Sequence, residues 1–289
     1  MGEAVGRLDR SNTAIVVDST SDMPEVLRTD PNVSMVPLNV HFGDETYRDW
    51  IDLKPREFYA RLLTVERLPT TSQPSAGAFL AEYRRLREGF ENVYSIHLSG
   101  KLSGTVESAR LAQSQVDGVT VVDTEVACLA ISLLVQCLLR KLDEGTTDQE
   151  FQAFIDRYTQ KSGRLFMLDT LEYLQRGGRI GRASSLAGSL LNIKPLLTFS
   201  DGVVAPYKKV RGERKAVTAM VEYFLELTRP GVPVRVGLSH AAAPQKMEEL
   251  EAMIMATDRE SDICLRGEVG AVIGTYAGPG AVALFFIEE

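Results

Sequence analysis

The chain has 289 residues, of which 44% are hydrophobic and 25% charged, a balance typical of a globular protein with one large domain or two ordinary ones. Its formal net charge is −7 without a long basic run, which argues against binding to the phosphate backbone of a nucleic acid. Cys128, Cys137 and Cys264 form no CxxC pair, so neither a disulfide framework nor a cysteine zinc site is predicted.

The first dozen residues are predicted to form a loose tail, and they lack the apolar stretch of a signal peptide. The longest apolar run, 126–139, is too short to cross a hydrocarbon core of roughly 30 Å at about 1.5 Å per residue. We interpret this run as a buried helix. A soluble, cytoplasmic protein without an integral membrane segment is expected.

Short apolar runs alternate with helical patterns in the first half of the chain. Helices are predicted after an N-cap at Ser21, over 75–88, after Thr105 and over 126–139. Strands are predicted at 13–17, 33–38, 93–98 and 119–122. This alternation predicts a parallel sheet with helices on both faces, forming a three-layer domain over 13–165.

The second half has a different pattern. Asp201-Gly202 predicts a hairpin between 196–199 and 203–205, because both turn positions tolerate a positive φ. Helices are predicted over 214–227 and 245–255, and strands over 234–238, 263–266 and 282–287. We expect a mixed α+β domain over 166–289, so the predicted fold class is α/β with two domains.

Two segments combine hydroxyl side chains with predicted helix starts, PTTSQPS at 69–75 and LSGKLSGT at 98–105. Ligands of open α/β sheets bind beyond the carboxyl ends of the strands, and a helix amino terminus offers N–H groups to an anion. Ordinary caps and turns use the same residue types, which is the alternative. The candidate donors to a carboxylate or phosphate are Thr70, Thr71, Ser72, Ser99, Ser103 and Thr105.

A third segment, LEYLQRGGRIGRA at 171–183, places Arg176, Arg179 and Arg182 around two adjacent glycines. Arginine makes bidentate contacts with carboxylates and phosphates, and glycine lets a ligand approach the backbone closely. The alternative is a helix end with solvated arginines. A glycine-dense loop, GTYAGPG at 274–280, precedes the last strand.

The sequence contains no GxxxxGK[ST] motif and no GxGxxG that opens a helix. Its three histidines lack the spacing of metal ligands, so no metal and no cofactor are predicted. His97 lies two residues from Ser99 and shares a strand face with it, which makes a Ser–His pair one hypothesis. A partly buried structural histidine is the other.

Five motifs, in order, closely resemble the DegV family, the fatty-acid-binding subunits that work with bacterial fatty acid kinases. They are VDSTSDMP at 17–24, PTTSQPS at 69–75, LSGKLSGTVESA at 98–109, YLQRGGRIGRA at 173–183 and IGTYAGPGA at 273–281. The resemblance covers about 14–287. It implies a DegV-like fold of two α/β domains with an apolar tunnel for one acyl chain, such as that of palmitate or oleate.

The resemblance also implies how the ligand is held and used. Thr71 and Ser103 are the first candidates to hold the carboxylate, with Arg179 bordering the head group. Thr70, Ser72 and Ser99 would lie close by. A separate ATP-dependent fatty acid kinase would phosphorylate the carboxylate, so the chain itself needs no catalytic residue.

Two positions depart from the family pattern. Many relatives read LSS in the second loop, where this chain has Gly100, and one possible carboxylate donor is thereby lost. Relatives often carry a histidine in the final glycine-rich loop, where this chain has Tyr276. Either the Tyr276 hydroxyl replaces that histidine in head-group binding, or the chain does without it.

Two other functions remain as hypotheses. A small-carboxylate binding or regulatory protein would have a short polar pocket instead of a long apolar tunnel. A serine acyl hydrolase or transferase would use Ser99 or Ser103 as nucleophile and His97 as base. It also needs a third group to orient the histidine, for which the sequence offers no candidate.

Overall fold

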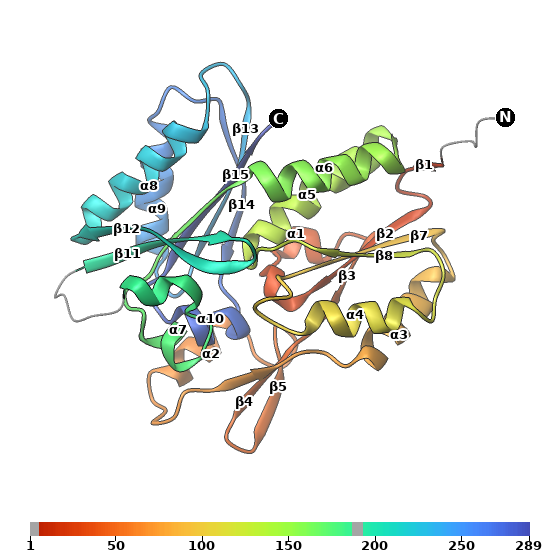
Figure 1. Cartoon of the computed structure of the whole chain (residues 1–289), viewed down its shortest axis with the longest axis horizontal. Helices are drawn as coiled ribbons and strands as arrows, with labels where there is room; N and C mark the ends of the chain where they lie inside the picture. Colours follow the sequence, from red (N-terminus) through yellow and green to blue (C-terminus); the bar gives the residue numbers. More distant parts are fainter. Residues whose placement is uncertain (1–5, 187–192) are drawn as a thin grey trace.

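The computed structural model describes residues 6–186 and 193–289, and its first half is built on a parallel sheet (Figure 1). The strand order is β3-β2-β7-β8, and all three pairings are parallel. Strand β2 is buried along its whole length, which suits an apolar run that is covered on both faces. The strands are β2 (Thr13–Asp18), β3 (Val33–Val36), β7 (Asn92–His97) and β8 (Val119–Asp123).

Helices cover both faces of this sheet, as predicted. Ala14 and Val16 belong to the core that includes α3 (Ala76–Arg87) and α4 (Thr105–Gln113). The intervening Ile15 and Val17 point to the other face and belong to the core that includes α5 and α6. Those two helices are α5 (Leu129–Glu144) and α6 (Asp148–Lys161).

The second half is built on a six-stranded mixed sheet with the order β12-β11-β10-β15-β13-β14. Among its described strands only β13 and β14 pair in parallel, and the Asp201-Gly202 hairpin joins β11 to β12 as predicted. Helices α8 (Glu213–Leu227) and α9 (Pro244–Met255) cover one face. The strands are β10 (Gly163–Met167), β11 (Ile193–Ser200), β12 (Val203–Arg211), β13 (Val234–His240), β14 (Ser261–Glu268) and β15 (Val282–Glu288).

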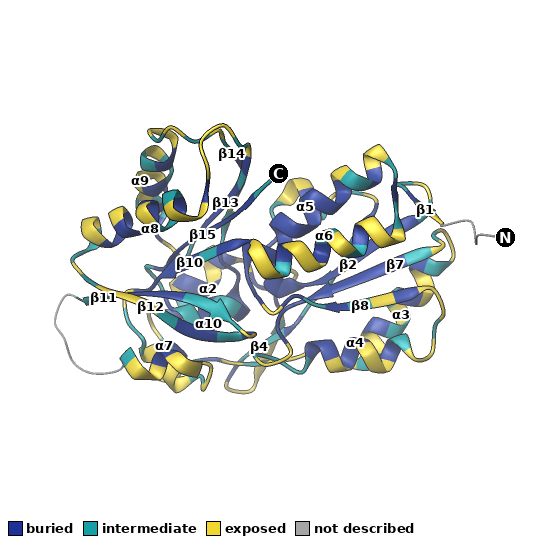
Figure 2. Cartoon of the chain, turned by 45° about the horizontal axis from the view of Figure 1, so that its top comes forward, coloured by how far each residue is buried: buried dark blue, intermediate teal, exposed yellow. Residues whose placement is uncertain are grey.

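Helix α5 packs between the two sheets and is buried on nearly all sides, as Figure 2 shows. Leu129 reaches both β13 and β14, where a Cβ at Gly237 or Gly267 would lie 3.3 Å from its methyl groups. The prediction of a buried helix is confirmed, but the helix begins three residues later than predicted. Cys128 has a φ of 67°, which is incompatible with an α-helix and delays the start.

Helix α10 (Ala271–Ala277) contacts α2, α7, β4 and β6. Further small elements complete the described fold. They are α1 (Glu25–Arg28), α2 (Pro55–Leu62), α7 (Glu172–Arg176), the 3-10 turns Ser19–Ser21 and Gly181–Leu186, and the short strands β1 (Arg7–Leu8), β4 (Asn39–Phe42), β5 (Glu45–Arg48), β6 (Thr70–Ser72) and β9 (Thr146–Thr147).

Two local predictions were wrong. The tail is not loose throughout, because β1 pairs with β9 and buries Leu8; residues 1–5 lie outside the described ranges. Ser21 does not cap a helix. It ends a 3-10 turn that Asp18 caps, and the following helix begins after Pro24. The predicted boundary at 165/166 falls inside β10, which pairs only within the second sheet, and the two-domain division stays a proposal.

Candidate functional site

A cavity of about 360 Å³ lies between the two halves of the chain. This volume falls within the range of roughly 300–1,000 Å³ that is usual for small-molecule sites. Most of its wall is apolar, which suits a hydrocarbon ligand. Both halves contribute, and the larger apolar side chains are Leu38, Leu98, Phe166, Leu174, Phe199 and Phe285.

The second sheet supplies one wall of the cavity through a row of cross-strand neighbours. Ala283 on β15 pairs with Phe166 on β10 and with Ser239 on β13, and all three line the cavity. Because side chains alternate along a strand, Leu284 and Phe286 point instead into the core under α8 and α9. Small Ala283 leaves room in the middle of this wall.

Polar side chains gather at one end of the cavity around Tyr276 on α10. The hydroxyl groups of Tyr276 and Thr71 share a hydrogen bond of 2.6 Å, and the Arg179 guanidinium lies 5.1 Å from the centre of the tyrosine ring. Gly177 permits this packing, since a Cβ there would lie 2.3 Å from the ring. Two hydroxyls and one cation thus converge where a carboxylate would need hydrogen-bond donors.

The segment 69–75 contributes to the cavity through the strand β6, and it ends at Ser75, which caps α3 where a helix start was predicted. Strand β6 pairs with β4, and its alternation directs Thr71 to the cavity and Thr70 away from it. Thr70 is exposed and does not line the cavity. Ser72 lies on the cavity rim, where its hydroxyl bonds to the His41 ring at 2.9 Å.

The loop after β7 brings Ser103 to the cavity but turns Ser99 away. The Ser103 hydroxyl lines the cavity and lies 2.9 Å from that of Thr105 at the start of α4. Ser99 is buried, and its hydroxyl donates to the carbonyl of Gly202 at 2.6 Å. Ser99 therefore ties this loop to the β11–β12 hairpin.

Gly100 does not leave a gap in the cavity wall, because this position does not line the cavity. Its N–H donates to the Asp123 carboxylate at 3.1 Å, and a Cβ at this position would lie 2.9 Å from the same oxygen. A serine here would contact Asp123. A glycine at this position therefore removes no donor from the cavity wall.

The three arginines of segment 171–183 have different environments. Arg176 pairs with Glu172 at 2.6 Å, and Arg182 pairs with Asp201 at 2.8 Å. Arg179 reaches the cavity, with its guanidinium donating to backbone carbonyls of Gly177 and Leu102. All three side chains are exposed, as the alternative interpretation predicts, and of the three only Arg179 also lines the cavity.

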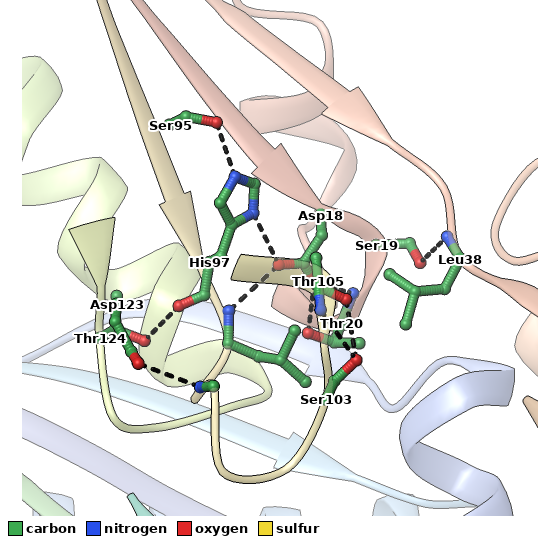
Figure 3. A network of polar contacts seen from close by, with 12 residues as sticks. Asp18, Ser19, Thr20, Leu38, Ser95, His97, Ser103, Thr105, Asp123 and Thr124 are labelled. Atoms are coloured by element: carbon green, nitrogen blue, oxygen red, sulfur yellow. Dashed lines mark hydrogen bonds and ion pairs between the residues drawn. The ribbon is translucent and has the colours of Figure 1, made fainter. Parts of the chain in front are cut away.

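His97 belongs to a buried polar network that Figure 3 shows, and it does not pair with Ser99. Its ring lies 2.6 Å from the Ser95 hydroxyl and 2.9 Å from the Asp18 carboxylate. This order of serine, histidine and aspartate resembles a catalytic triad. All three side chains are fully buried and none lines the cavity, so the arrangement holds the sheet and the following loop together.

Two buried carboxyl groups hold the start of α10, and sequence reasoning missed both. Asp22 accepts from the N–H of Gly270 at 2.8 Å, and Asp49 accepts from that of Ala271 at 3.0 Å. Burial raises the pKa of Asp49 to about 7, and burial together with the nearby Asp49 raises the pKa of Asp22. Asp22 stands in the VDSTSDMP motif, but nothing in the sequence indicates that it reaches a helix 248 residues away.

Gln73 is a further residue of the site that the sequence did not single out. Its side-chain amide donates to Ser108 at 2.9 Å and lies against Gly104 in the cavity wall.

Within 6–186 and 193–289, no three His, Cys, Asp or Glu side chains come together as metal ligands. Among the described helices, none combines the length and apolar character that a membrane crossing needs.

Comparison with known proteins covers nearly the whole chain. A family described as "Uncharacterised protein, DegV family" matches residues 12–289. A DegV domain-containing protein of Halalkalibacterium halodurans is 38% identical over 96% of this chain and 99% of its own length. Protein DegV of Bacillus subtilis is 36% identical over 94% of this chain and 98% of its own.

Solved structures agree with this match. A Thermus thermophilus DegV family protein, described by its fatty acid binding, has a TM-score of 0.92 at 36% identity and covers 96% of this chain and 100% of its own. DegV of Bacillus subtilis, described as a fatty acid binding protein, has a TM-score of 0.87 at 34% identity and covers 96% and 100% of the two chains.

Proposed function

Because the chain belongs to the DegV family, we propose that it is a non-catalytic carrier that binds one long-chain fatty acid, such as palmitate or oleate. The observation that carries this proposal is the form of the cavity. Its wall is apolar, and its polar end brings together Thr71, Tyr276, Ser103 and Arg179. The fatty acid binding described for relatives of 36% and 34% identity supports the same ligand.

The energetics favour a long chain. Each methylene removed from water stabilises the complex by about 0.8 kcal/mol before the costs of binding. The apolar wall therefore supplies the affinity, and the polar end orients the carboxylate. A short polar carboxylate would gain nothing from the apolar wall, which disfavours the small-carboxylate alternative.

The proposal includes a partner. A separate ATP-dependent fatty acid kinase phosphorylates the bound carboxylate, and this carrier presents the group. Ser103 and Arg179 line both the cavity and an outer hollow, so the carboxylate is the end of the ligand nearest the surface. Such a partner places the protein in the cytoplasm, where ATP is available.

Titration of delipidated protein with palmitate tests the carrier. Isothermal calorimetry is expected to give one site per chain, whereas binding of acetate but not palmitate would overturn the proposal.

The partner is tested by adding ATP and a bacterial fatty acid kinase, and trapping acyl phosphate with hydroxylamine. Palmitoyl hydroxamate is expected only when carrier, kinase and ATP are all present, and its formation without this chain would contradict the presenting role.

The acyl hydrolase or transferase alternative has less support. Ser99 lies outside the cavity wall, and His97 contacts Ser95 and Asp18 instead of Ser99 or Ser103. Neither candidate nucleophile therefore has a base at hydrogen-bond distance among the described residues.

A further inference from the structure

A second hollow of about 370 Å³ lies beside the polar end of the cavity. It is bounded by the loop that carries Ser103 and by the glycine-rich turn that carries Arg179. Ser103, Leu102, Gly104 and Arg179 line both spaces, so the two share one wall. A group attached to a carboxylate at Ser103 would therefore extend into this hollow.

The hollow is lined by two cations and by no carboxylate. Lys101 and Arg179 form no ion pair among the described residues, unlike the neighbouring Arg182. Two acids close to the hollow have other hydrogen-bond partners: Asp123 accepts from Gly100, and Asp201, whose pKa is lowered by Arg182 first and also by Lys101, pairs with Arg182. Four of the remaining lining residues are glycines, which leave the backbone accessible: Gly100, Gly104, Gly178 and Gly181.

The Lys101 side chain is exposed and its stem lies against the β11–β12 hairpin. A Cβ at Gly202 would lie 3.4 Å from the Lys101 side chain, so the lysine stem lies directly across this turn. The Lys101 N–H donates to the Ser99 hydroxyl at 3.2 Å, and that hydroxyl donates to Gly202. Ser99 thus positions the lysine at the hollow.

We propose that this hollow is a phosphate subsite that holds the phosphoryl group of the acyl phosphate product, an inference that rests on the proposed function. In the kinase step, a carboxylate oxygen bonds to the γ-phosphorus of ATP. The bond from that phosphorus to the bridging oxygen breaks, and ADP leaves with the electron pair. The phosphoryl group carries on the order of −1.5 to −2 charges, which a second cation beyond Arg179 stabilises.

The test compares two lipids that differ at the head group. Palmitate fills the cavity alone, and (2-oxoheptadecyl)phosphonate is a stable analogue of palmitoyl phosphate in which CH₂ replaces the bridging oxygen. Lys101→Gln is expected to weaken phosphonate binding about tenfold and to change palmitate binding by less than about twofold. Lys101→Arg is expected to restore most of the phosphonate affinity.

Lys161→Gln, at the carboxyl end of α6, is the matched control and is expected to change neither affinity. The titrations contain no kinase and no nucleotide, so a loss of affinity measured in them reports on contacts with the lipid's own phosphonate.

Unchanged phosphonate binding in Lys101→Gln, with palmitate bound normally, would overturn the subsite and leave the carrier intact. An effect of Lys101 seen only with kinase and ATP would assign the hollow to a nucleotide phosphate and also overturn it. A wild-type protein that binds neither lipid would overturn the proposed function, and this inference with it.

Discussion

At the scale of single residues, the head-group end depends on which face of a short strand a side chain occupies. Thr70 and Thr71 are adjacent and chemically identical, and only Thr71 faces the cavity. The motif alone does not distinguish them, because the choice is set by the pairing of β6 with β4. The pair therefore offers a test with its own control.

Thr71→Val removes the hydroxyl that bonds to Tyr276 while keeping the shape of the side chain. We expect it to weaken palmitate binding by at least about tenfold, since a head-group hydrogen bond to a charged carboxylate is worth about 1.5–3 kcal/mol. Thr70→Val is the control and is expected to bind normally. Calorimetric titration measures both, and equal losses in the two variants would contradict the assignment of Thr71.

Asp49 gives a prediction about pH. Its pKa is raised by burial from 3.8 to about 7, so between these values the folded chain binds a proton that the unfolded chain has lost. The contribution of Asp49 to stability therefore falls as pH rises from about 4 to about 7 and levels off above that. Asp49→Asn is expected to reduce the change in the free energy of unfolding between about pH 4 and about pH 7 by a few kcal/mol. Asp44→Asn, in an exposed turn, is expected to leave that change as it is in the wild type.

Urea unfolding at several pH values measures this effect. A slope that is identical in wild type and in Asp49→Asn would mean that the buried carboxyl does not hold its proton. The direction also matters, because a carboxyl stabilised in its charged form would give stability that rises with pH.

Sequence reasoning predicted several residues that line the cavity, but it did not predict the long-range contacts that other motif residues make. Ser103, Arg179 and Tyr276 line the cavity, and their binding roles stay predictions. Ser99 and Asp22 act on partners far along the chain, Gly202 and Gly270 respectively. Contacts of this kind are set by tertiary packing, and no local pattern reveals them.

At the scale of elements, the loop that carries Ser103 is held by the end of β2. The Asp18 carboxylate accepts from the N–H of Leu98 at 3.1 Å and from that of Thr20 at 3.0 Å, and it lies beside the His97 ring (Figure 3). The aspartate thus joins two neighbouring strand ends. A buried acceptor with several donors is costly to lose.

Asp18→Asn is expected to lower the free energy of unfolding by about 2–4 kcal/mol, because an amide donates where the carboxylate accepted. Asp117→Asn, on the surface before β8, is expected to change it by less than about 0.5 kcal/mol. Chemical unfolding measures both. A loss in Asp18→Asn no larger than in the control would show that the network does not hold the loop.

The row of residues across β10, β15 and β13 predicts a control of acyl length. Ala283→Phe places a ring in the middle of the cavity wall. We expect palmitate to bind at least about tenfold more weakly while laurate keeps its affinity, since the space lost is a fixed length of chain. Near-ultraviolet circular dichroism checks folding, and an equal loss for both lipids would argue against this placement of the chain.

The larger elements were predictable and the smaller ones were not. The alternating pattern of the first half and the Asp201-Gly202 turn predicted both sheets, because buried parallel strands and tight hairpins have strong local signals. The small sheet β5-β4-β6 was missed, since its strands are short and largely polar. The strand within segment 69–75 was therefore not predicted, whereas the helix start that follows it at Ser75 was.

At the scale of the whole molecule, the cavity forms only where the two halves meet. The first half supplies Thr71 and Ser103, and the second supplies Tyr276, Arg179 and the sheet wall around Phe285. Helix α5 packs against β13 and β15 of the second sheet and against the 3-10 turn Ser19–Ser21 that follows β2 of the first. Neither half forms the cavity alone, which explains why four of the five motifs contribute to its wall from separate parts of the chain.

The bound lipid itself is the most direct measurement. The protein is purified without added lipid, denatured and extracted with organic solvent, and the released molecules are identified and counted by mass spectrometry. A carrier predicts close to one long-chain fatty acid per chain, with Ala283→Phe shifting the mixture to shorter acids. An empty extract, together with no thermal stabilisation by palmitate or oleate, would contradict fatty acid binding by this cavity.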